Sequence, residues 1–179
     1  MGIGSCNRYV SVEEEIERLK ACPIDLCFNQ MMYMQNINEE WSKDDSVSMY
    51  RPSSGLVVYF DSTICATCSV KTLYKWYDIM DKSRKNYNQD FKFYFIFSTS
   101  SDQIEDINYS LNSISFDYPI FLDTCNIFTK KNTNLPTNPL LHVFMIDKNR
   151  NVVMVGSPLN NERLENAYWR KLKHLTRNY

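Results

Sequence analysis

The chain has little glycine, no concentration of charge of one sign and no long apolar run. Its four glycines include one Gly-x-Gly, Gly2-Ile3-Gly4, which follows no strand, and this argues against a glycine-rich nucleotide loop. The net charge is −1 and the basic residues are scattered, so the basic patch of a nucleic-acid-binding protein is missing. The longest apolar stretches have strand length, far below the roughly 20 residues of a membrane span. We therefore expect no nucleic-acid partner and a soluble body.

The remaining composition is that of an ordinary folded protein. Hydrophobic residues make up 44% and charged residues 23% of the 179 residues, which is enough chain for one sizeable core with an extension. The six cysteines would suit an oxidising compartment, but they are too few and too dispersed for a dense disulfide framework. Their placement is more informative than their number.

The most informative stretch begins with the apolar run LVVYF at 56–60, which predicts a buried strand. A short polar turn follows, and then a helix whose first turn contains Cys65 and Cys68. Residues three apart lie on one face of a helix, so the two sulfurs can meet in a small disulfide ring. Unpaired N–H groups at a helix N-terminus favour a thiolate, which predicts Cys65 as the nucleophile of a redox pair.

A second interpretation of the same pair is half of a zinc site. Zinc needs further ligands, which Cys125 with His142 or His174 could supply. Nothing in their spacing supports this, and His142 falls in a predicted strand.

Before the cysteine pair, the sequence predicts a helix, a strand and a loop. Ser11 as N-cap and Glu14 three residues later form a capping box, and Pro23 ends the helix. Alternating apolar and polar residues at 24–28 predict a half-buried strand. The polar, acidic stretch 36–48 predicts a loop leading into a short strand near Met49 and Tyr50.

The other cysteines allow two interpretations each. Cys22 and Cys27 either form a disulfide across a turn or are two small buried apolar side chains, and the second is the better supported. Cys125 is either a buried structural cysteine, which is favoured, or a second resolving thiol.

After the cysteine pair, alternating elements are predicted. The helix continues to Met80, and the nearly continuous apolar run 91–97 predicts a central strand covered on both faces. The further predicted elements are a helix over 104–111, a strand over 118–123, a hairpin over 141–156 and a last helix from about 160 to 172.

This order of elements resembles the thioredoxin fold in its TlpA/ResA-like, AhpC/TSA-type branch. The resemblance rests on CATC at 65–68 directly after LVVYF, and on VFMIDKNRNVV at 143–153, which looks like the family's hairpin. The chain is also similar to the thioredoxin-like lipoproteins of Bacteroidetes. The resemblance implies an α/β, thioredoxin-like fold: a central mixed β-sheet flanked by helices, with an N-terminal helix and strand extension over 1–54 and the thioredoxin-like domain over 55–179.

The resemblance also identifies substituted positions. The family's cis-proline position falls on Leu141, and Pro139 could serve only if the chain has a two-residue shift. At Leu141 we expect a trans bond because a non-proline cis bond costs roughly 3–4 kcal/mol. Ile64 replaces the tryptophan that usually precedes the first cysteine, so Ile64 and Leu141 are the predicted substrate-groove residues. Tyr59 stands where thioredoxin has a buried acid, and Asp61 or Asp102 is a candidate replacement base.

The N-terminal Ile3-Gly4-Ser5-Cys6 resembles the end of a bacterial lipoprotein signal peptide. On that interpretation the protein is periplasmic or at the cell envelope, and a lipid on Cys6 would anchor it to a membrane. Without an upstream signal segment, it is cytoplasmic and the stretch is a plain terminus.

The leading functional hypothesis is a thiol–disulfide oxidoreductase in which Cys65 attacks a protein or peptide disulfide and Cys68 resolves the mixed disulfide. It needs no metal or organic cofactor. Ser62, Thr63 and Lys71 are candidates for tuning the Cys65 thiolate, the first two as helix caps and hydroxyl donors. The rival hypothesis is a non-catalytic thioredoxin-like module that binds proteins or peptides and has a vestigial or structural CxxC. A peroxidase is a minor alternative, because the threonine and arginine pattern of such a centre is missing.

Overall fold

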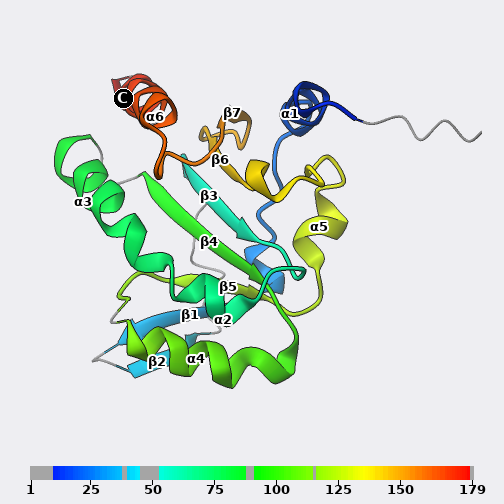
Figure 1. The fold of residues 1–179 in the computed structure, drawn as a ribbon, viewed down its shortest axis with the longest axis vertical. Helices are drawn as coiled ribbons and strands as arrows, with labels where there is room; N and C mark the ends of the chain where they lie inside the picture. The colour runs from blue at the N-terminus through cyan, green and yellow to red at the C-terminus, as the bar shows by residue number, and fades with distance from the viewer. Residues whose placement is uncertain (1–9, 38–39, 45–52, 88–90, 115, 178–179) are drawn as a thin grey trace, which may run out of the picture.

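The computed structural model describes residues 10–37, 40–44, 53–87, 91–114 and 116–177. Within these residues, seven strands form one sheet in the order β2-β1-β5-β4-β3-β6-β7 (Figure 1). The strands are β1 (Met32–Ile37), β2 (Glu40–Asp44), β3 (Gly55–Phe60), β4 (Lys92–Ser98), β5 (Ile120–Asp123), β6 (Val143–Ile146) and β7 (Val152–Val155).

The centre of the sheet is parallel and its two sides are antiparallel. β4 pairs parallel with both β3 and β5, and Phe97 lies opposite Phe60 on one side and Leu122 on the other. β6 pairs antiparallel with β3, and β1 pairs antiparallel with β5. The carboxyl ends of β3, β4 and β5 therefore meet at one edge of the sheet, which is where ligands and reactive groups collect in open α/β sheets.

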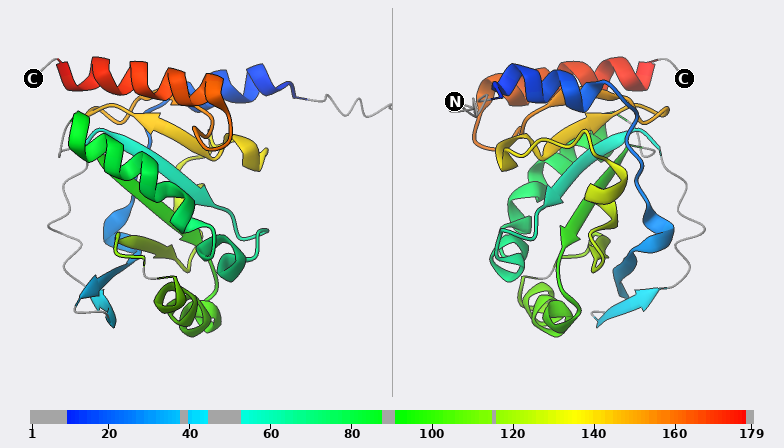
Figure 2. Two further views of the ribbon diagram at one scale, coloured as in Figure 1. Left: turned by 60° about the vertical axis from the view of Figure 1, so that its left-hand side comes forward. Right: turned by 90° about the vertical axis from the view of Figure 1, so that its right-hand side faces the viewer.

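Helices cover both faces of the sheet. They are α1 (Val12–Lys20), α2 (Ala66–Val70), α3 (Tyr77–Asn86), α4 (Ile104–Ser113), α5 (Ile127–Lys131) and α6 (Glu162–Arg177), with 3₁₀-helices η1 (Phe28–Gln30), η3 (Leu73–Trp76), η4 (Ser101–Gln103) and η5 (Pro139–Leu141). Figure 1 shows α1 and α6 on either side of the β6–β7 hairpin, and Figure 2 shows α4 and α6 at opposite ends of the sheet. No helix in the described residues has both the length and the apolar character needed to cross a membrane.

The apolar run of β4 supplies two separate cores. Phe93, Phe95 and Phe97 pack in one buried cluster with residues of α2, α3, α4 and α6. Tyr94 and Ile96, which point to the opposite face, pack in the second cluster with residues of α1, η1 and α5. A strand covered on both faces needs apolar residues at every position rather than at alternate ones, which explains the sequence of β4. The predicted mixed sheet flanked by helices is therefore confirmed.

The predicted strand at 24–28 is wrong. Ile24 and Leu26 are buried on either side of the exposed Asp25, but Cys27 and Phe28 are buried as well, so the alternation stops at Leu26. The backbone groups bond to loops instead of a neighbouring strand: the Ile24 N–H donates to the Arg150 carbonyl at 2.9 Å, and the Asp25 N–H to Asn132 Oδ1 at 2.8 Å. Strand β1 begins only after η1. Periodicity alone cannot distinguish a strand from an extended chain with other partners.

The predicted loop over 36–48 is also wrong in part. It contains the end of β1 and all of β2, which pair antiparallel with Ile37 opposite Glu40. β2 is an edge strand, and edge strands are commonly polar, so its composition resembles that of a loop. The strand predicted near Met49 and Tyr50 lies outside the described residues.

The single helix predicted from Cys65 to Met80 is divided into α2, η3 and α3. The Thr72 N–H and hydroxyl both bond to the Ser69 carbonyl, at 2.9 and 2.7 Å. These bonds over three residues tighten the chain at the end of α2 into a 3₁₀ turn. The apolar stripe of the predicted helix is retained because Leu73, Trp76 and Met80 are all buried.

Candidate active site

The candidate site begins where β3 ends. A short turn brings the chain from Phe60 to α2, held by Asp61: its carboxylate accepts the Thr63 N–H at 2.7 Å and its carbonyl accepts the Ile64 N–H at 3.0 Å. Asp side chains commonly bond to the backbone two residues on, which is why this turn is compact. The turn places Cys65 as the N-cap residue of α2.

Cys65 and Cys68 are joined as a disulfide, with their Cα atoms 5.3 Å apart. Both residues are exposed at the carboxyl edge of the sheet. The sequence prediction that the two sulfurs can meet is therefore confirmed. A reversible disulfide at an exposed position can exchange with thiols of other molecules.

Several hydrogen bonds hold the first turn of α2 around Cys65. Its Sγ accepts the Cys68 N–H at 3.3 Å and lies 3.4 Å from the Thr67 hydroxyl oxygen. Its carbonyl accepts both the N–H and the hydroxyl of Ser69, at 3.0 and 3.1 Å. Thr67 was not among the residues predicted to tune Cys65, although a hydroxyl side chain between the two cysteines was visible in the sequence.

The three predicted tuning residues lie around the pair. Ser62 and Thr63 are exposed in the turn, and Lys71 is exposed at the end of α2. Because Cys65 is itself the N-cap of α2, the capping role expected of Ser62 or Thr63 is wrong. An effect of these three residues on the Cys65 thiolate stays a prediction.

Tyr59 lies in the buried layer below the turn. Burial raises the pKa of its hydroxyl to about 12, although the nearby Ser98 and Thr129 side chains act in the opposite direction. The phenol is therefore protonated at neutral pH and cannot take the place of a carboxylate that accepts a proton. Asp102 is a poor candidate base as well, because hydrogen bonding, first to the Ser100 side chain, lowers the pKa of its carboxyl.

The two residues predicted for the substrate groove differ in exposure. Ile64 is 38% exposed next to Cys65, whereas Leu141 is only 7% exposed and packs in the core. Its neighbour Leu140 is 80% exposed on η5. The described residues contain no cis peptide bond, so the trans bond expected at Leu141 is present. The groove itself stays a prediction.

The remaining described cysteines are free. Cys22 is exposed and Cys27 is buried, so they form no disulfide, and the interpretation as buried apolar side chains holds for Cys27 only. The favoured interpretation of Cys125 is wrong, because this residue is exposed. Asp123 takes the buried position at the end of β5 and accepts the backbone N–H of Cys125, which turns the chain outward. Cys6 lies outside the described residues.

The zinc interpretation finds no support in the geometry. No group of three or more His, Cys, Asp or Glu side chains in the part of the chain that the structure describes is close enough to hold a metal ion. His142 is buried with its Nε2 2.9 Å from the Pro136 carbonyl, and His174 is exposed on α6.

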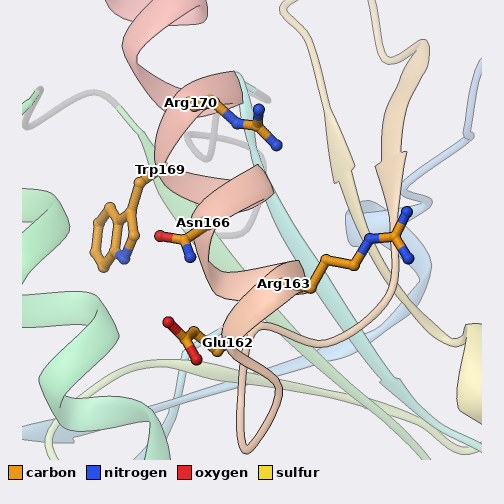
Figure 3. Close-up of a pocket in the computed structure, with 5 residues that line it drawn as sticks. All are labelled: Glu162, Arg163, Asn166, Trp169 and Arg170. Atoms are coloured by element: carbon orange, nitrogen blue, oxygen red, sulfur yellow. The ribbon is translucent and has the colours of Figure 1, made fainter.

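A shallow hollow of about 650 Å³ lies on the surface of α6, away from the cysteine pair. Figure 3 shows its lining residues, which all come from this one helix: Glu162, Arg163, Asn166, Trp169 and Arg170. α6 lies at the β7 end of the sheet in Figure 2, so the hollow takes no part in the candidate site.

Comparison with known proteins gives likeness in structure only. No family model and no curated protein matches the chain. Among solved structures, a protein from Aquifex aeolicus VF5, named provisionally as an electron transfer protein, has a TM-score of 0.52 at 12% identity, over 84% of this chain and 96% of its own. The thioredoxin domain of a thiol-disulfide oxidoreductase from Bacteroides vulgatus has a TM-score of 0.45 at 12% identity, over 84% and 98%. An uncharacterized thioredoxin-like protein from Porphyromonas gingivalis has a TM-score of 0.44 at 14% identity, over 81% and 89%.

The order of elements, with the cysteine pair directly after a central parallel strand, defines the fold as thioredoxin-like. At such low sequence identity, likeness to solved structures supports the fold but not the activity, which depends on the residues of the site.

Proposed function

We propose that this protein is a thiol–disulfide oxidoreductase that acts on protein or peptide thiols and disulfides through Cys65 and Cys68. The observation that carries the proposal is the position of this disulfide: it is exposed, at the carboxyl edge of the parallel strands, on the first turn of α2. A structural disulfide needs only to be formed, whereas a catalytic one must also be reached by a substrate sulfur.

The reaction proceeds in two exchanges. In the reduced protein, the Cys65 thiolate attacks one sulfur of a substrate disulfide, forms a mixed disulfide and releases the other substrate sulfur as a thiolate. The Cys68 thiolate then attacks Cys65 Sγ, which releases the second substrate thiolate and leaves the Cys65–Cys68 disulfide seen in the structure. Both released thiolates take up protons from solvent, and the reverse sequence oxidises a substrate dithiol.

Cys65 is the nucleophile in this scheme because its sulfur is the acceptor of the local hydrogen bonds. The Cys68 N–H donates a hydrogen bond to Cys65 Sγ, with 3.3 Å between the nitrogen and the sulfur. A hydrogen bond to the charged form of a group favours that form, so the Cys65 thiolate is favoured over that of an unassisted thiol.

We further propose that the protein acts outside the cytoplasm, held at a membrane by a lipid on Cys6. The support for this is the Ile3-Gly4-Ser5-Cys6 pattern alone. Mass spectrometry of protein from the membrane fraction of its native host should find a lipid-modified Cys6 as the first residue. An unmodified chain confined to the soluble cytoplasmic fraction would contradict the location and leave the thiol chemistry untouched.

The thiol chemistry is tested by redox titration with mass-spectrometric trapping and by reduction of insulin disulfides. We expect a reversible Cys65–Cys68 disulfide, faster alkylation of Cys65 than of a model thiol at neutral pH, and loss of insulin reduction in Cys65→Ser. Cys68→Ser should accumulate mixed disulfides on Cys65, because the resolving thiol is missing. Cys22→Ser, which removes an exposed cysteine outside the pair, is the matched control and should retain the activity.

The rival function, a non-catalytic module that binds proteins or peptides, predicts the opposite result. If Cys65 alkylates no faster than a model thiol and Cys65→Ser reduces insulin as the unmodified protein does, the oxidoreductase proposal is wrong.

A further inference from the structure

Thr67 makes a side-chain contact with Cys65 that the two-exchange scheme does not use. Its hydroxyl oxygen lies 3.4 Å from Cys65 Sγ, within the range of a hydrogen bond to sulfur. In the disulfide this sulfur is only a weak acceptor. After reduction the same position holds a thiolate, and a hydrogen bond to a charged group is roughly twice as strong as one between neutral groups.

Hydrogen bonds as well as the disulfide hold the backbone that carries the Thr67 hydroxyl. The backbone of this turn is held by the Ser69 bonds to the Cys65 carbonyl and by the Lys71 N–H, which donates to the Thr67 carbonyl at 3.3 Å. The β-branched Thr67 side chain has few rotamers available in a helix. We therefore expect the hydroxyl to stay close to the sulfur that becomes charged on reduction.

The second donor to Cys65 Sγ is a backbone group. Every residue type at position 68 except proline would supply the N–H that lies 3.3 Å away. The hydroxyl, in contrast, is specific to threonine or serine at position 67. It is the part of the site that a substitution can remove without changing the backbone or either cysteine.

We propose that Thr67 sets the redox poise of the pair: its hydroxyl donates a hydrogen bond to the Cys65 thiolate, stabilises the reduced protein and makes the disulfide a stronger oxidant. This inference rests on the proposed thiol–disulfide function. A pair whose reduced form is stabilised has a higher reduction potential and transfers its disulfide more readily to a substrate dithiol.

The test compares Thr67→Val with Thr67→Ser in the full chain. Valine keeps the shape and the branching and removes the hydroxyl, whereas serine keeps the hydroxyl and removes the methyl group. Two quantities are measured: the pH profile of Cys65 alkylation in the reduced protein, resolved by peptide mass spectrometry, and the equilibrium with reduced and oxidised glutathione. Thermal unfolding of both variants checks that they are folded.

In Thr67→Val we expect the pH profile of Cys65 alkylation to move to higher pH. At a pH below the midpoint of this profile, the variant should have on the order of tenfold less Cys65 thiolate than the unmodified protein. At a pH where the Cys65 thiolate predominates, the glutathione equilibrium should shift about tenfold toward the protein disulfide, which corresponds to a reduction potential about 30 mV lower. Thr67→Ser should stay close to the unmodified protein in both measurements.

Two results would overturn the inference. The first is a Thr67→Val protein that matches the unmodified one in both measurements, and the second is an equal shift in Thr67→Val and Thr67→Ser, which would assign the effect to the methyl group. Failure of the proposed function looks different: the unmodified protein would then form no reversible Cys65–Cys68 disulfide with glutathione, whatever residue stands at position 67.

Discussion

The phenol ring of Tyr59 packs against the imidazole of His142, with 5.1 Å between the ring centroids. The Tyr59 N–H also donates to the His142 carbonyl at 3.0 Å, so the pair joins the end of β3 to the segment that enters β6. Both side chains are almost completely buried. Because burial raises the pKa of Tyr59 to about 12, its phenol is a structural link below the active site rather than a proton acceptor for it.

The raised pKa of Tyr59 predicts a loss of stability in alkaline solution. The folded phenol keeps its proton up to about pH 12, whereas the unfolded one loses it near its ordinary value of 10.0. Between these values the unfolded chain binds fewer protons than the folded one, so the free energy of unfolding falls as the pH rises. Two pKa units correspond to a fall of about 2 to 3 kcal/mol from Tyr59 alone.

Urea unfolding at a series of pH values between about 9 and 12 measures this fall. Tyr59→Phe should flatten the alkaline decline, because the variant has no phenol that titrates at this position. Tyr109→Phe is the matched control because Tyr109 is 80% exposed on α4. If Tyr59→Phe and Tyr109→Phe decline alike, Tyr59 is not the group that titrates.

The elements that the sequence predicts well are those whose pattern has one physical explanation. An apolar residue at every position of 93–97 suits only a segment covered on both sides, and it became the central strand β4. The capping box was equally specific: the Ser11 hydroxyl accepts the Glu14 N–H at 3.2 Å, and the Glu14 carboxylate accepts the Ser11 N–H at 2.9 Å. Local chemistry alone decides such features.

The misplaced features depend on partners far away in the chain. Ile24 and Leu26 are buried like strand residues, yet the bonds of this segment go to loops more than a hundred residues away, such as the one containing Asn132. The exposure of Cys125 follows from Asp123, whose buried carboxylate also accepts the Phe128 N–H at 2.8 Å. Spacing within the sequence places Cys65 beside Cys68, but it does not give the rotamer that brings the Thr67 hydroxyl to the sulfur.

Thiol accessibility gives a prediction that is independent of catalysis. In the oxidised native protein, a maleimide should modify the exposed Cys22 and Cys125 rapidly. Cys27 is buried, and burial raises the pKa of its thiol from 9.0 to about 12, which leaves about a thousandfold less thiolate at neutral pH. We therefore expect Cys27 to react slower by three orders of magnitude or more.

Peptide-resolved mass spectrometry after timed labelling measures the three rates. Labelling in concentrated urea is the control, because in the unfolded chain all three thiols should react at similar rates. Native labelling of Cys27 as fast as Cys125 would show that the segment between α1 and β1 is not packed as described.

Glu15 joins α1 to the segment before η5, and its hydrogen bonds predict a loss of stability in acid. Its side chain is buried, and its carboxylate accepts the Thr137 N–H at 3.1 Å, the Thr137 hydroxyl, and the Asn138 N–H at 3.4 Å. These hydrogen bonds, first the one from the Thr137 side chain, lower the pKa of the Glu15 carboxyl. A group whose pKa is lowered by folding contributes stability above its unfolded value of 4.5, and this contribution is lost as the pH falls through the folded value.

We expect Glu15→Gln to lower the free energy of unfolding by about 1 to 2 kcal/mol at pH 7, because an amide accepts these bonds more weakly than a carboxylate and brings donors of its own. The difference from the unmodified protein should shrink on acidification, since Glu15 then becomes neutral as well. Glu17→Gln, an exposed substitution on the same helix, should cost no more than about 0.5 kcal/mol at either pH. Urea unfolding at neutral and acidic pH measures all three proteins, and a Glu15→Gln deficit that stays constant with pH would place its origin in packing rather than in the charge of Glu15.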